Sequence, residues 1–289
     1  MSVPAPFEYH PARTVEEAIS LLQQYGDDAK VLAGGHSLVP AMKLRLIQPE
    51  HLVDIGRIDG LSFIREEQGA IAVGPMTTYI TLARSEVLRR HFPLLPEAVS
   101  VIADLMVRNR GTIGGSIVEF DPAGDMPAIV LALKADIVAQ GPNGKRTIKA
   151  DDFFVDTFQT ALNADEIVTE IRFALPPAHT GSAYSKLENK ASHYAISGCA
   201  AVISVGGDGK CSAASLTITG AASRITRAST AEAALVGKKC DEATIADAAS
   251  HAADGLDLIS DIHGSTDYRR QMTAVVARRA MMKALEMLP

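Results

Sequence analysis

The sequence predicts an α+β protein in two parts, and three observations carry this prediction. A strand–helix–strand pattern opens the chain within residues 7–33. Glycine-containing turns at residues 66–69, 141–144 and 206–210 are then flanked by strand-like runs, as in antiparallel hairpins. Finally, Pro176-Pro177, followed closely by glycine and serine, is the best boundary signal in the chain. We therefore expect domains over residues 1–176 and 177–289.

The opening elements follow from local signals. Phe7–Tyr9 is predicted to be extended. Thr14 and Glu17 form a capping box that predicts a helix over residues 15–25, with Gly26 as its stop. Residues 29–33 and 51–55 are predicted to be strands because they are short, mainly apolar runs.

The later elements are assigned in the same way. A helical region is expected from residue 77 to about residue 103, broken at Pro93 and Pro96. A further helix is expected from Asp125 through Leu133. The remaining predicted strands are residues 61–64 and 70–73, the two that flank the turn at 141–144, and residues 167–173, 200–205 and 214–219; the rest of the chain is predicted to be alanine-rich helix.

Composition narrows the class of protein. The 289 residues are 47% hydrophobic and 21% charged, with a net charge of −6, which is typical of a soluble globular protein and disfavours nucleic acid as the main partner. Three widely spaced cysteines, Cys199, Cys211 and Cys240, fit neither a disulfide framework nor an iron–sulfur or zinc ligand set, and suit a reducing compartment. With no export signal and no apolar run of about 20 residues, we expect no membrane span.

Two glycine runs are the main functional signal. Ala33-Gly34-Gly35-His36-Ser37 and Thr112-Ile113-Gly114-Gly115-Ser116 each place a glycine pair before a hydroxyl-bearing residue, at expected strand ends. Paired glycines turn tightly and present bare N–H groups, which suit phosphate oxygens. One such run is usually an ordinary turn, but two together predict a ligand with two phosphates. Neither is a Rossmann or P-loop fingerprint.

Nearby charged residues leave two alternatives open. Arg108 and Arg110 either offset phosphate charge or lie in a solvated turn. Asp125 either accepts hydrogen bonds from ribose hydroxyls or caps its own helix.

No acid–base or nucleophile set stands out. The eight histidines are scattered without an H-x-H or H-E-x-x-H spacing, so no protein-held metal is expected. The absence of catalytic side chains favours a protein whose chemistry belongs to a bound organic cofactor.

The residues resemble one family over essentially the whole chain. Residues 33–43, 108–116 and 121–127 are similar to the two flavin loops, and the segment after them, of the FAD-binding medium subunit of the molybdenum hydroxylases (xanthine oxidase type), with the nearest likeness to the aerobic carbon monoxide dehydrogenase medium subunit. Residues 166–171, Tyr184–Lys186, Tyr194-Ala195, Tyr268-Arg269 and Arg278–Ala280 match in kind and order.

The resemblance implies a fold and a cofactor site. Residues 1–176 would be an FAD-binding domain of the PCMH (vanillyl-alcohol-oxidase-like) type with subdomains at about 1–56 and 57–176, and residues 177–289 a smaller α+β domain covering the flavin. Residues 33–37 and 112–116 would bind the pyrophosphate through N–H groups. The other implied cofactor residues are Asp125 on ribitol or ribose hydroxyls, Ile102, Lys186 and Tyr194 by the isoalloxazine ring, and Val168 in the matched 166–171 segment; for Tyr194, packing on its strand is the alternative.

The resemblance also implies partners. An electron-transfer flavin subunit would receive electrons from a 2Fe-2S small subunit, while a molybdopterin-bearing large subunit oxidises carbon monoxide, an N-heterocycle or an aldehyde. A dimer of heterotrimers in the cytoplasm, or peripherally on the inner membrane, is implied. Two alternatives remain: a self-contained FAD-dependent reductase or oxidase, and a non-catalytic nucleotide-binding module.

Three places in the chain depart from the family pattern. Asparagine is common where this chain has Ser116, and smaller or polar residues are common at Glu119 and Phe120. A basic pair is common where this chain has Asn189-Lys190. We expect Phe120 to narrow solvent access to the flavin or to change which acceptor approaches it.

Overall fold

The N-terminal body is a three-stranded parallel sheet with one helix against it. In the computed structural model, which describes residues 3–289, strands β1 (Glu8–Pro11), β3 (His51–Asp54) and β2 (Ala29–Leu32) lie in the order β1-β3-β2. The predicted helix is α1 (Val15–Tyr25): the Thr14 hydroxyl accepts from Glu17 N, and the Glu17 carboxylate accepts from Arg13 N. Gly26, at φ 54°, ends it.

The middle body is a five-stranded antiparallel sheet in the order β4-β5-β10-β6-β7. Its strands are β4 (Ile64–Glu67), β5 (Ala70–Val73), β10 (Ile167–Ala174), β6 (Asp136–Gly141) and β7 (Gly144–Lys149). The first strand of the first hairpin spans residues 64–67, whereas residues 61–64 were expected. Its two-residue turn ends on Gly69 at φ 78°, which pairs Glu67 with Ala70 and places the charged strand at the sheet edge.

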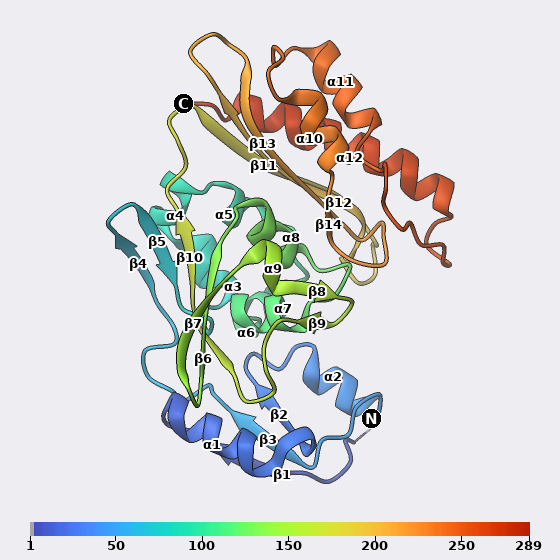
Figure 1. The fold of residues 1–289 in the computed structure, drawn as a ribbon. Coiled ribbons are helices and arrows are strands. Elements are labelled where there is room, and N and C mark those ends of the chain that lie inside the picture. The colour runs from blue at the N-terminus through green and yellow to red at the C-terminus, as the bar shows by residue number, and fades with distance from the viewer. Residues whose placement is uncertain (1–2) are drawn as a thin grey trace.

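Six short helices pack beside this sheet (Figure 1). They are α3 (Tyr79–Arg84), α4 (Glu86–His91), α5 (Leu94–Ser100), α6 (Leu105–Arg110), α7 (Ile113–Glu119) and α8 (Asp125–Ala132). The expected break at Pro96 is wrong, because Pro96 is the third residue of α5, in a first turn whose N–H groups have no helical partner. The break at Pro93 is confirmed, as Pro93 precedes α5.

The second glycine pair does not lie at a strand end, as was expected. Gly114 and Gly115 belong to the first turn of α7, where the Thr112 hydroxyl caps the helix by accepting from Gly115 N. Glycine is less favourable than alanine in a helix by about 1 kcal/mol. Tertiary packing nevertheless requires glycine at position 114, because a Cβ on Gly114 would lie 2.4 Å from Pro75 Cβ.

The C-terminal body is a four-stranded antiparallel sheet between two helical layers (Figure 1). Its strands are β11 (Thr180–Glu188), β12 (Ala195–Val205), β13 (Cys211–Thr219) and β14 (Thr226–Arg227), which confirms the predicted hairpin. One face contacts α5 and α8, where the Thr217 hydroxyl donates to Ala128 O at 2.7 Å. The other face is covered by α10 (Ser229–Leu235), α11 (Glu242–Ser250) and α12 (Thr266–Glu286).

Smaller elements complete the chain. They are the 3-10 turn η1 (Gly26–Asp28), α2 (Leu38–Lys43), α9 (Ala150–Phe153), and the β8 (Phe154–Asp156) and β9 (Gln159–Thr160) pair. Across residues 3–289, none of the helices has both the length and the apolar character needed to cross a membrane.

Candidate functional site

A pocket lies where the three bodies meet. Its walls come from the loop between β2 and α2, from the helices of the middle body, and from the loop before β12. The lining residues are Val31, Ala33, Gly34, Gly35, His36, Ser37, Leu38, Tyr79, Ile102, Ala103, Val107, Gly111, Thr112, Gly115, Ser116, Glu119, Asp121, Gly124, Asp125, Ser192, His193 and Tyr194.

The first glycine run presents free backbone donors to this pocket. Among residues 3–289, no acceptor pairs with the N–H groups of residues 34–37, whereas Gly35 O and Ser37 O accept the first amide bonds of α2. Gly35 has φ 75°, a conformation that a residue with a side chain adopts only with strain. The His36 ring lies against the same loop, with Nδ1 3.0 Å from Gly34 O. Such a row of amides binds anionic oxygens.

The two glycine runs are brought together by close backbone packing. Gly34 lies against the last residue of α6, where a Cβ would come within 2.2 Å of Arg110 O and 3.1 Å of Gly111 Cα. Because neither contact involves a flexible side chain, only glycine allows the first loop to approach so closely. The loop's position at the pocket therefore depends on Gly34.

The second glycine run contributes differently from what was expected. Each N–H group of residues 113–116 already has an acceptor: Thr77 O, Pro75 O, the Thr112 hydroxyl and Thr112 O, in order. Only Thr112, Gly115 and Ser116 of this run reach the pocket wall. The segment thus offers the Thr112 and Ser116 hydroxyls and the N–H of Thr112, which has no acceptor among residues 3–289, while the row of bare amides comes from the first loop.

The two arginines upstream also differ from each other. The Arg108 guanidinium donates to Ile102 O and Ala103 O, both at 2.9 Å, and thereby holds the loop that places Ile102 in the pocket wall. Arg110 is exposed and does not line the pocket. Arg108 thus contributes by positioning the Ile102–Ala103 loop.

Asp125 sits in a buried network at the pocket floor. As the first residue of α8 it does not cap the helix with its side chain. Instead, it accepts hydrogen bonds from the Tyr184 hydroxyl and, at 3.0 Å, from Lys186 Nζ. Burial raises the pKa of the Asp125 carboxyl, and the Lys186 ammonium opposes that shift. Each carboxylate oxygen keeps a lone pair for a ligand hydroxyl.

Lys186 connects this network to the loop that carries Tyr194. Its Nζ also donates to His193 O at 2.7 Å, with the side chain only 2% exposed. Tyr194 itself is 45% exposed and forms part of the pocket wall, so its ring is open to a ligand and is not packed on a strand. Desolvation in the pocket wall, followed by the nearby carboxylates, raises the pKa of Tyr194 to about 12, so its hydroxyl stays protonated at neutral pH.

The position of Phe120 overturns the expectation for this residue. Phe120 is 1% exposed and stacks on Phe154, with ring centroids 4.5 Å apart, so it faces the core and does not border the pocket. Its neighbours Glu119 and Asp121 do line the pocket, and burial raises the pKa of both carboxyls. The backbone at Phe120 is left-handed (φ 47°), so Phe120 points into the core while Glu119 and Asp121 face the pocket.

Eleven of the fifteen predicted cofactor residues line the pocket. The other four are Ile113, Gly114, Val168 and Lys186. Lys186 reaches the site through Asp125, whereas Ile113, Gly114 and Val168 are buried in packing between elements. Sequence reasoning did not single out Tyr79, whose pKa is raised by complete burial. Its only signal was its place at the start of the helical region predicted from residue 77.

Comparisons with known proteins cover nearly the whole chain. Residues 5–176 match the family described as FAD binding domain in molybdopterin dehydrogenase, and residues 182–284 match the CO dehydrogenase flavoprotein C-terminal domain. The chain is 42% identical over 282 residues to the carbon monoxide dehydrogenase medium chain of Hydrogenophaga pseudoflava, covering 98% of each protein.

Two further relatives extend the comparison. The chain is 38% identical to the 6-hydroxypseudooxynicotine dehydrogenase complex subunit alpha of Paenarthrobacter nicotinovorans, covering 98% of this chain and 95% of the relative. A solved carbon monoxide dehydrogenase from Hydrogenophaga pseudoflava, which lacks the Mo-pyranopterin moiety of its cofactor, superposes with a TM-score of 0.96 at 44% identity, covering 99% and 100% of the two chains.

Proposed function

The chain belongs to the FAD-binding medium subunits of the molybdenum hydroxylases, and from this we propose that it binds FAD in the pocket between its three bodies. This FAD passes electrons from partner iron–sulfur clusters to an external acceptor. The chain is an oxidoreductase subunit that works with a large and a small partner subunit. The observation that carries the proposal is the row of four free amides at residues 34–37, facing the same pocket as Asp125 and Tyr194.

The residues present fit FAD. A pyrophosphate needs several donors and no side chain in the way, which the amides of residues 34–37 and the missing Cβ at Gly35 provide. A ribitol or ribose needs acceptors, which Asp125 supplies. A flat ring system needs apolar and aromatic walls, which Ile102 and Tyr194 supply.

Each group has a distinct task in the proposed site. The first loop holds the pyrophosphate, and Thr112 and Ser116 contribute hydroxyls to the same pocket wall. Asp125 accepts from the sugar hydroxyls, and Lys186 fixes the orientation of its carboxylate. Tyr194 shields one edge of the ring from water, and Arg108 maintains the loop that presents Ile102.

We assign the finer organisation as follows. Subdomains at residues 1–56 and 57–176 clasp the cofactor, and residues 177–289 cover it. The small subunit holds 2Fe-2S clusters, the large subunit holds molybdopterin, and the complex is a dimer of heterotrimers in the cytoplasm, either free or peripherally attached to the inner membrane. The oxidised substrate is bound on the large subunit and is carbon monoxide, an N-heterocycle or an aldehyde; the names of the two relatives include carbon monoxide and 6-hydroxypseudooxynicotine.

The test is to purify the chain with the proteins that accompany it in its own cells. We expect two further subunits, molybdenum, and FAD at one per medium chain. Removal of FAD should leave substrate-driven reduction of the clusters intact and abolish reduction of an external acceptor. Turnover by the chain with FAD alone would instead indicate a self-contained flavoenzyme, and a bound nucleotide other than FAD would indicate a binding module.

A further inference from the structure

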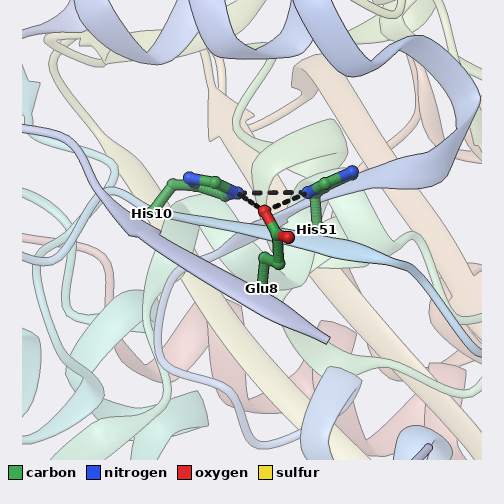
Figure 2. A group of neighbouring side chains, drawn as sticks. All are labelled: Glu8, His10 and His51. Atoms are coloured by element: carbon green, nitrogen blue, oxygen red, sulfur yellow. Dashed lines mark hydrogen bonds and ion pairs between the residues drawn. The ribbon is translucent and has the colours of Figure 1, made fainter. Parts of the chain in front are cut away.

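A group of potential metal ligands lies on one face of the N-terminal sheet, outside the pocket lining. Glu8 and His10 are on β1, and His51 is on the neighbouring strand β3. Because β1 and β3 are parallel with Glu8 opposite His51, and because side chains repeat every two residues along a strand, all three project from the same face. Figure 2 shows the two imidazole rings and the carboxylate converging.

The three ligand atoms have the spacing of a metal site. Glu8 Oε2 lies 3.7 Å from His10 Nε2 and 3.6 Å from His51 Nδ1, and the two nitrogens are 3.1 Å apart. A point equidistant from these atoms lies about 2.0 Å from each, which matches zinc bonds to imidazole nitrogen and carboxylate oxygen of about 2.0–2.2 Å.

The two rings are held in place by a third aromatic residue. Tyr25, the last residue of α1, stacks on His51 with centroids 3.7 Å apart and planes at 17°, and on His10 at 4.9 Å and 27°. The histidine side chains are only 20% and 16% exposed. Binding therefore does not have to order the two imidazoles, which lowers its entropic cost.

The surroundings leave the carboxylate and one coordination position available. Within residues 3–289, no lysine or arginine forms an ion pair with Glu8, so no protein cation competes for its oxygens. The Glu8 side chain is 71% exposed, which leaves room for water at a fourth position. A His₂Glu set completed by water is an arrangement that zinc adopts in proteins.

We propose that Glu8, His10 and His51 bind one divalent transition metal ion of the zinc class. The ion joins β1 to β3 across 41 residues of chain between the two histidines, and so fastens the N-terminal strand to the sheet that carries the first glycine loop. The sequence predicted no metal site because the histidines show no H-x-H or H-E-x-x-H spacing, whereas the proposed set combines Glu8 and His10 of one strand with His51 of another.

The test is a calorimetric titration of the full chain with zinc chloride, after removal of metals by a chelator. We expect one site per chain, and a dissociation constant weakened at least about tenfold by Glu8→Gln or His51→Gln, the lower end of what loss of even an outer-shell partner costs. Glu8→Gln is nearly isosteric at an exposed position, so folding should be retained, as circular dichroism would verify.

The matched control is His251→Gln. His251 is also flanked by carboxylates, with Nδ1 2.7 Å from Asp254 and Nε2 3.9 Å from Asp247, but these contacts use opposite ring nitrogens and cannot meet at one ion. The control should bind zinc like the parent. Equal zinc affinity in the parent, Glu8→Gln and His51→Gln, or sulfur ligands in the zinc X-ray absorption spectrum, would overturn the proposal. Because zinc is the readout, this outcome is independent of flavin content.

Discussion

Replacing Gly34 by alanine should detach the flavin without unfolding the protein. The added Cβ would lie 2.2 Å from Arg110 O and 3.1 Å from Gly111 Cα, both backbone atoms at the end of α6. The loop must then retreat by about 1 Å to restore ordinary van der Waals contact. A retreat of that size lengthens the amide–phosphate hydrogen bonds beyond their working range of about 2.7–3.2 Å.

The loss can be estimated from the donors involved. Residues 34–37 present four N–H groups that have no acceptor among the described residues. A hydrogen bond to a charged group contributes about 1.5–3 kcal/mol, so weakening one or two of them costs about 3 kcal/mol. Since about 1.4 kcal/mol is a tenfold change, the dissociation constant of FAD should rise about 100-fold.

The assay is quenching of flavin fluorescence on titration of FAD with the flavin-free protein. Gly207→Ala is the control, because a Cβ at Gly207 meets nothing within 4 Å and its turn lies far from the pocket lining. It should bind FAD as the parent does. If folded Gly34→Ala protein bound FAD within about threefold of the parent, the assignment of the first loop to the pyrophosphate would be refuted.

Three further predictions concern the network, the core and the ring wall. Asp125→Asn leaves the buried Lys186 ammonium without its carboxylate and should lower the free energy of unfolding, measured by urea denaturation, by about 3–5 kcal/mol. The double variant with Lys186→Met should lose less stability than the sum of the two single variants. Burial raises the pKa of Cys199 to about 12, above its unfolded value of about 8.5, so stability is lost as pH rises. Between pH 8 and 10 the parent should lose about 2 kcal/mol more than Cys199→Ala, and equal slopes would contradict this. Tyr194→Ala should raise the fluorescence of bound flavin while changing stability by less than about 0.5 kcal/mol, because the side chain is half-exposed; unchanged fluorescence would place Tyr194 away from the ring.

Local sequence was a good guide wherever the determining contacts are close in the chain. Helix α1 has the predicted bounds because Thr14, Glu17 and Gly26 act within one turn of its ends. The β12–β13 hairpin was likewise predicted from the glycine-rich turn at residues 206–209. The α+β class and the membership of the flavin family are confirmed, since residues 5–176 and 182–284 match the two family models and a carbon monoxide dehydrogenase medium chain is 42% identical over 282 residues.

Errors arose where distant residues decide local structure. Gly114 and Gly115 begin a helix that the Thr112 hydroxyl caps, and glycine is required at Gly114 because Pro75, distant in the sequence, packs against it. Phe120 was expected at the flavin but is buried against Phe154, since left-handed backbone turns it inward. Neither outcome can be derived from residue type or spacing.

From the order of its residues alone, this chain could be assigned an α+β fold and a pair of glycine runs suited to a diphosphate. Three-dimensional packing alone decided which of those runs has a row of amides to spare, because the N–H groups of residues 113–116 in the second run are taken by Thr77, Pro75 and Thr112. It also decided that Asp125 meets Lys186 and that Glu8 meets His51. These partners are tens of residues apart, and only the paired strands and stacked bodies bring their charges within reach.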